Sequence, residues 1–90
     1  MNYISINGIV TSKRNSNPIF NASVHIKCTE NEGLNTDMKT DVKGRFRFEL
    51  PRQYAFTIRA DYNDAFSQEY FIPKNQKRAY LYLFIEEINE

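Results

Sequence analysis

The sequence predicts an all-β fold in which residues 1–90 form a single domain, a seven-stranded antiparallel β-sandwich. Apolar and polar residues alternate with a period of two, which is typical of half-buried strands, and no segment keeps the 3.6-residue period of a helix. Turn-forming residues separate these segments at intervals of roughly ten residues, as in β-sandwiches. A chain of 90 residues is long enough for one modest core.

The first three predicted strands differ in how apolar they are. Residues 3–10 form the first strand, and Gly8 within it indicates a bulge or a close approach of the backbone. Residues 35–41 are polar and charged, which is typical of an edge strand. Residues 22–29 lie between them and alternate cleanly, so their inward side is predicted to hold Ala22, Val24, Ile26 and Cys28.

The middle of the chain predicts a turn followed by a hairpin. Asp41 and Gly44 occupy the first and last positions that a type I turn prefers. Residues 45–50 and 54–62 each alternate, and pairing them around a loop at 51–53 brings their apolar sides together. In this register Phe46 faces Ile58, Phe48 faces Phe56, Leu50 faces Tyr54, and Arg45 lies opposite Arg59.

The last two predicted strands are residues 65–73 and 79–87. Residues 79–85, AYLYLFI, break the alternation because seven consecutive positions are apolar. A covered central strand, a strand with scattered outer tyrosines, or a binding surface would each explain this pattern. We expect the branched aliphatic residues to point inward and the aromatic residues outward: Leu81, Leu83 and Ile85 inside, Tyr80, Tyr82 and Phe84 outside.

Several short motifs occur in a recognisable order. They are Gly8-Ile9-Val10-Thr11, Asn17-Pro18-Ile19, Ala22-Ser23-Val24, Thr40-Asp41, Gly44-Arg45-Phe46-Arg47-Phe48, Leu50-Pro51 and Tyr54. Across residues 4–60 this order resembles the carboxypeptidase regulatory-like domain family. The resemblance implies a transthyretin-like (prealbumin-like) Greek-key sandwich that is generally non-catalytic and acts as a spacer, assembly module or partner-binding appendage. Where the family often has Gly-Tyr, this chain has residues 61–64, so Asn63 or Asp64 is expected to supply the turn.

The sequence offers no catalytic machinery. His25 is the only histidine and is predicted to face outward, and Cys28 is the only cysteine and is predicted to be buried. No second histidine or cysteine offers the spacing of metal ligands, so neither a metal nor another cofactor is expected. Hydroxyisourate hydrolase, which resembles this fold, relies on several histidines, an arginine and a C-terminal Tyr-Arg-Gly-Ser, whereas this chain ends in EEINE.

A similar sandwich family carries an internal Lys–Asn isopeptide bond beside a buried carboxylate. The residues that could correspond are Lys13, Glu49 and Asn89. Lys13 falls in a predicted loop and Glu49 is predicted to face outward, so the sequence does not favour this bond.

Charge and hydropathy narrow the class of partner. Twelve basic and eleven acidic residues leave a net charge of +1, so nucleic acid is not an expected partner, and little charge repulsion opposes self-association. No apolar run is long enough for a membrane-spanning helix. The N-terminus lacks the features of a signal peptide, so a cytoplasmic location is expected unless a dedicated machine exports the chain or a signal has been trimmed.

The predicted function is a non-catalytic module for protein–protein interaction or assembly, through self-association or docking onto a larger protein. One version of this hypothesis is an adaptor or tip piece of a bacterial secretion or cell-surface machine. The alternative is a carbohydrate-binding module that stacks surface aromatics on sugars, although the chain has no tryptophan. The predicted partner-binding residues are Tyr70, Tyr80, Tyr82 and Phe84; the arginines predicted either to bind an anion or acidic partner or to form an ordinary solvated face are Arg45, Arg47 and Arg59.

Overall fold

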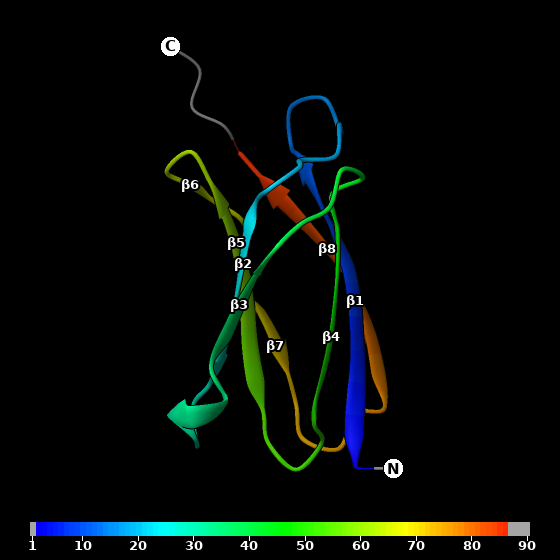
Figure 1. The fold of residues 1–90 in the computed structure, drawn as a ribbon, viewed down its shortest axis with the longest axis vertical. Helices are drawn as coiled ribbons and strands as arrows, with labels where there is room; N and C mark the ends of the chain where they lie inside the picture. Colours follow the sequence, from blue (N-terminus) through cyan, green and yellow to red (C-terminus); the bar gives the residue numbers. More distant parts are fainter. Residues whose placement is uncertain (1, 87–90) are drawn as a thin grey trace.

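The computed structural model describes residues 2–86 and folds them into two β-sheets that pack face to face (Figure 1). A short 3₁₀-helix, η1 (Glu32–Leu34), lies between the second and third strands. The strands are β1 (Tyr3–Ser12), β2 (Ser23–Cys28), β3 (Thr36–Lys39), β4 (Arg45–Pro51), β5 (Phe56–Tyr62), β6 (Ala65–Phe66), β7 (Tyr70–Ile72) and β8 (Arg78–Ile85).

The two sheets differ in size, and the core lies between them. The smaller sheet has three strands in the order β4-β1-β8. The larger has five strands in the order β3-β2-β5-β6, with β7 also paired to β5. The predicted alternation is confirmed, because the inward residues of both sheets form one buried cluster. It includes Ile4, Ile6 and Val10 of β1, Val24 and Ile26 of β2, Phe56 and Ile58 of β5, and Leu81, Leu83 and Ile85 of β8.

The prediction of a purely antiparallel sandwich is wrong for one pair of strands. β8 runs parallel to β1, with Ser5 beside Arg78 and Ser12 beside Ile85. The chain leaves β7 in the larger sheet and returns through residues 73–77 to the start of β1, where the backbone N–H of Ser5 bonds the carbonyl of Lys77. β8 therefore enters the smaller sheet in the same direction as β1.

The predicted hairpin of residues 45–62 is also wrong. β4 pairs with β1 and β5 pairs with β2, so the two segments belong to different sheets. The apolar sides of both segments nevertheless reach the same core, where Phe46 and Phe56 are buried. Two alternating segments satisfy the hydrophobic pattern equally well side by side or across a sandwich, and the sequence pattern alone does not distinguish these arrangements.

The segment predicted as one strand at residues 65–73 forms two, so the described residues hold eight strands and not seven. Ser67 interrupts the segment between β6 and β7. Its backbone N–H donates to the carbonyl of Ala60, and its hydroxyl oxygen accepts the N–H of Ala60. One buried residue thus satisfies both backbone groups of Ala60, and regular pairing of β5 resumes only at β7.

Several local predictions are confirmed. β3 is an edge strand, Cys28 is buried, and a turn closes with the Gly44 N–H donating to the Asp41 carbonyl. Both Asn63 and Asp64 adopt positive φ, +49° and +65°, between the paired residues Tyr62 and Ala65. Positive φ at both positions of a two-residue loop matches the twist of the flanking strands.

Gly8 marks a close approach and not a bulge. The pairing of β1 with β4 continues through Gly8 without an extra residue, and Phe46 is its partner. A Cβ on Gly8 would lie 2.3 Å from the Cζ of Phe46, so the phenyl ring occupies the space that a side chain would need. The glycine therefore makes room in the core for the ring on the neighbouring strand.

We predict that Gly44→Ala destabilises the fold strongly while Gly33→Ala does not. Gly44 has φ +74°, and a Cβ there would lie 2.6 Å from the carbonyl oxygen of Val10, whereas the nearest atom to a Cβ on Gly33 is 3.2 Å away. Strain of this kind costs about 2 kcal/mol or more of unfolding free energy. Urea unfolding of both variants checks this, and equal losses would contradict the assignment.

Candidate functional site: the outer face of the three-stranded sheet

The solvent side of the smaller sheet gathers aromatic and basic side chains on adjacent strands. We call it the outer face. The pairing registers place its residues in rows across the strands: Arg47, Asn7 and Tyr80 form one row, and Arg45, Ile9 and Tyr82 form the next. The outer face consists of Arg45, Arg47 and Glu49 of β4, Ser5, Asn7, Ile9 and Thr11 of β1, and Tyr80, Tyr82 and Phe84 of β8.

The aromatic residues of β8 face outward, as the sequence predicted. Tyr80, Tyr82 and Phe84 are 52%, 54% and 42% exposed, while the intervening leucines are buried. The rings of Tyr80 and Tyr82 meet edge to face, with their centroids 5.0 Å apart. β8 is an edge strand of its sheet, so the explanation of AYLYLFI as a covered central strand is wrong.

Arg45 and Arg47 share this face with the tyrosines, whereas the sequence predicted two separate surfaces. Arg47 lies within 3.5 Å of Glu49 at an exposed position, a geometry that holds the two side chains only weakly. The neighbourhood of arginines and tyrosines depends on β1 lying between β4 and β8. The polar residues Ser5, Asn7 and Thr11 mark the outer side of β1 in the sequence, but they do not indicate which strands lie beside it.

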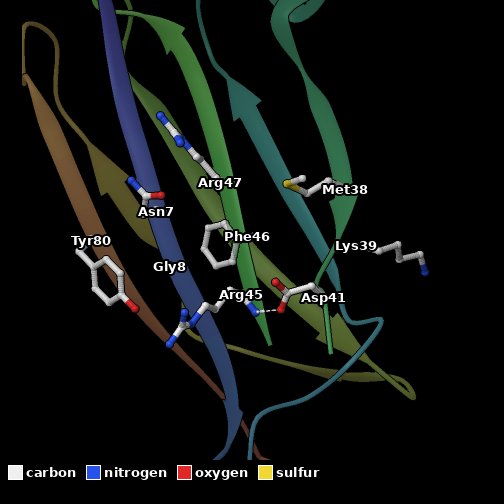
Figure 2. A pocket seen from close by; sticks show the side chains of 9 residues that line it. All are labelled: Asn7, Gly8, Met38, Lys39, Asp41, Arg45, Phe46, Arg47 and Tyr80. Atoms are coloured by element: carbon white, nitrogen blue, oxygen red, sulfur yellow. Dashed lines mark hydrogen bonds between the residues drawn. The ribbon is translucent and has the colours of Figure 1, made fainter. Parts of the chain in front are cut away.

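A hollow of about 520 Å³ opens beside these residues, at the edge where β4 approaches β3. Figure 2 shows the side chains of Arg45 and Tyr80 extending toward one another across β1. Lys39 adds a third positive group to the lining. The polar and charged lining residues are Asn7, Lys39, Asp41, Arg45, Arg47 and Tyr80.

Asp41 serves the turn beside this hollow. Its carboxylate accepts hydrogen bonds from the backbone N–H groups of Arg45 and Lys43. Both bonds lower the pKa of Asp41, and the bond from Arg45 lowers it most. Figure 2 shows the bond to Arg45. Asp41 therefore stays ionised and fixes the start of β4, the strand that carries both arginines.

Two residues of the predicted sites lie elsewhere. Arg59 pairs with His25 in the larger sheet and stacks on the ring of Phe66, 4.5 Å from its centroid, so the predicted Arg45–Arg59 pair is wrong. Tyr70 lies on β7 in the larger sheet and pairs with Ile58, so it does not extend the outer face. The first error follows from the wrong hairpin, and the second from taking β7 as the neighbour of β8, whereas β7 pairs with β5.

The Gln68 side chain covers part of the free edge of β8, a contact that the sequence did not predict. The Gln68 amide nitrogen donates to the carbonyl of Tyr82 at 2.9 Å, and its amide oxygen accepts the N–H of Phe84 at 3.0 Å. The amide thus imitates one residue of a neighbouring strand. The Gln76 amide nitrogen donates a single bond of this kind, to the carbonyl of Arg78.

His25 lies on the outer side of the larger sheet, as predicted, and two carboxylates hold it. Asp37 of β3 and Asp61 of β5 each hydrogen-bond one ring nitrogen. Burial by itself lowers the pKa of His25, but the hydrogen bonds and charges of Asp37 and Asp61 outweigh it and raise the pKa above 6.5. When protonated, the ring donates to both carboxylates and links three adjacent strands.

The described residues contain no cluster of three or more side chains suited to a metal ion. Lys13 and Glu49 are both exposed, and Lys13 approaches Glu86 at 3.5 Å. The outward position predicted for Glu49 is thereby confirmed. Asn89, the third residue considered for an isopeptide bond, lies outside the described residues. Within residues 2–86, no helix has the length and apolar character needed to cross a membrane.

The sequence was also compared with known proteins. The model of the carboxypeptidase regulatory-like domain matches residues 5–80. A comparison with the curated proteins finds no match.

Similar solved structures include pilin domains. Shaft pilin SpaA from Lactobacillus rhamnosus GG matches 100% of this chain with a TM-score of 0.67 and 8% identity, and the chain spans 48% of that pilin chain. The separate C-terminal domain of the same pilin matches 96% of this chain and is covered completely, with a TM-score of 0.67 and 6% identity. S.CueP matches 93% of this chain and is 62% covered, with a TM-score of 0.58 and 16% identity. These identities establish a shared fold only.

We predict that His25 makes the fold less stable as the pH rises. Folding raises the pKa of His25, so the protonated ring stabilises the fold fully at pH values below the unfolded pKa of about 6.5. This stabilisation is lost as the pH rises through the pKa of the folded state. Unfolding free energies of the wild type and His25→Gln, measured between about pH 5.5 and 8.5, should converge toward the alkaline end. NMR titration should show a lower pKa for His25 in Asp61→Asn. A difference between the two proteins that grows with pH would contradict this.

Proposed function

The chain belongs to the carboxypeptidase regulatory-like domain family, and from this premise we propose that it is a non-catalytic assembly module that binds protein through the outer face of its three-stranded sheet. The observation that carries the proposal is the row of exposed aromatics on β8 beside Arg45 and Arg47. His25, the side chain best suited to acid–base chemistry, is held by two carboxylates on the opposite sheet.

The size and composition of the outer face support a protein partner. An aromatic side chain can bury roughly 150–250 Å², so three half-exposed ones offer on the order of 300 Å². Patches of this size on a monomer are often functional. Tyrosine and arginine are also enriched among the residues that contribute most to binding between proteins.

The similarity to shaft pilin domains supports an assembly role on a structural β-sandwich. It favours an extracellular or surface-exposed setting over the cytoplasmic location expected from the N-terminus. An adaptor or tip role in a bacterial secretion machine is a narrower version of the same proposal, and the pilin fold supports only its general form.

A second candidate function is binding of an acidic carbohydrate. The hollow places Tyr80 near Asn7, Arg45 and Arg47, which supplies the polar groups that the sequence alone did not indicate. A tyrosine ring can stack on a sugar while an arginine holds its carboxylate by two parallel hydrogen bonds. The expected ligand class is a polymer of uronic acids.

We predict that Tyr82→Lys weakens self-association or partner capture by about tenfold or more, because the loss of a hot-spot aromatic from an interface costs about 2 kcal/mol or more. Phe71→Lys is the matched control, since Phe71 is at least as exposed as Tyr82 but lies on β7 of the larger sheet. Light scattering after size exclusion measures self-association, and pull-down with tagged protein measures capture. Equal effects of the two substitutions would count against the outer face.

For the second candidate, we predict that polygalacturonate in a native gel retards the wild type, and that Arg45→Ala and Tyr80→Ala remove the retardation. Arg59→Ala is the control, because Arg59 lies on the other sheet. A wild type that migrates unchanged would eliminate this candidate without affecting the first.

A further inference from the structure

We infer that two copies of this chain pair along the free edges of their β8 strands, antiparallel and centred on Tyr82, so that two three-stranded sheets become one six-stranded sheet. The inference rests on the proposed assembly function and names the partner as a second copy. It follows from the direction of the backbone groups on β8, from the order of its side chains, and from the contacts of Gln68.

The backbone groups of alternate β8 residues point away from β1. The carbonyl of Ile85 accepts the N–H of Lys13, so the odd-numbered residues bond on the side of β1. The carbonyl of Tyr82 and the N–H of Phe84 instead bond Gln68 on the opposite side. The even-numbered residues therefore direct their N–H and carbonyl groups to the free edge, where another strand would bond them.

The side chains of residues 78–86 match those of a second copy that runs in the opposite direction. With Tyr82 opposite Tyr82 of the second copy, Tyr80 faces Phe84 and Arg78 faces Glu86 at both ends. On the inner side, Leu81 faces Leu83, so the apolar inner face continues across the junction. Aromatic pairs and opposite charges directly across a pair of strands each stabilise it.

Other registers lose this match. Centring the pair on Tyr80 places Arg78 opposite Tyr82 and Phe84 opposite Gln76, which removes both ion pairs. A shift by one residue sets even-numbered positions against odd-numbered ones, so outer side chains would face buried positions. The aromatic and charged residues thus select the register centred on Tyr82.

In the monomer, the Gln68 side chain occupies part of the free edge of β8. Its amide makes two of the bonds that a second strand would make, and the residue is exposed, so its side chain can turn into solvent when a strand replaces it. Removing the amide therefore leaves Tyr82 and Phe84 without these partners in the monomer, which favours pairing.

Sedimentation velocity over a range of concentrations tests the inference, with circular dichroism to confirm folding. We expect the wild type to dimerise and Gln68→Ala to dimerise more tightly. Glu86→Arg sets like charges opposite at two sites and should weaken the dimer about tenfold, while Arg78→Glu combined with Glu86→Arg should restore it. Lys13→Ala is the control, since it removes the ion pair of Glu86 within one chain and should not weaken dimerisation.

The double substitution Arg78→Glu with Glu86→Arg is the decisive test of edge-to-edge pairing. Wild type and Gln68→Ala that both remain monomeric overturn the inference, and so does a dimer that the double substitution fails to restore. Neither result refutes the proposed function, because capture of a different protein that depends on Tyr82 and not on Phe71 would still support it. A dimer sensitive to Tyr82→Lys but indifferent to the charge exchange would place the contact on the outer face and not on the edge.

Discussion

The parallel pairing of β1 with β8 is the interaction on which the rest of the structure depends. It makes β1 the central strand of the smaller sheet and leaves β8 at the edge. It also brings the tyrosines of β8 into the same rows as the arginines of β4, with only β1 between them. Without this pairing, the inner face of β8 would not close the core, and its outer face would have no basic neighbours.

Both sides of β8 carry apolar residues, one side in the core and the other in solvent, which explains its unbroken apolar stretch. Its inward leucines and Ile85 complete the core, and its outward aromatics remain in solvent. Edge strands commonly avoid such exposure by means of charges or bulges. Here the amides of Gln68 and Gln76 occupy part of the edge, and the aromatic outer side is retained. The proposed assembly function gives this exposed aromatic surface a use that the stability of the fold does not require.

The sequence predicted which way side chains face far better than which strands are neighbours. A period of two fixes inward and outward sides residue by residue, so Phe46, Phe56 and Leu83 were all placed correctly in the core. Neighbours depend on contacts between distant segments, so residues 45–62 looked like a hairpin although β4 and β5 lie in different sheets. For the same reason, the sequence could predict the exposed aromatic residues of β8. It could not predict that they lie on the same face as Arg45 and Arg47, or that Arg59 and Tyr70 lie on the other sheet.

The central place of β1 also bears on when the chain can fold during synthesis. Both neighbours of β1 come from distant parts of the sequence, and β8 is the last of the described strands. Pairings of such long range are slow to form, because loop closure costs entropy before any contact repays it. While β8 is still within the ribosome, β1 has an open edge and the core is incomplete. We therefore expect the nascent domain to stay incompletely folded until β8 has left the ribosome, a state in which chaperones can bind it.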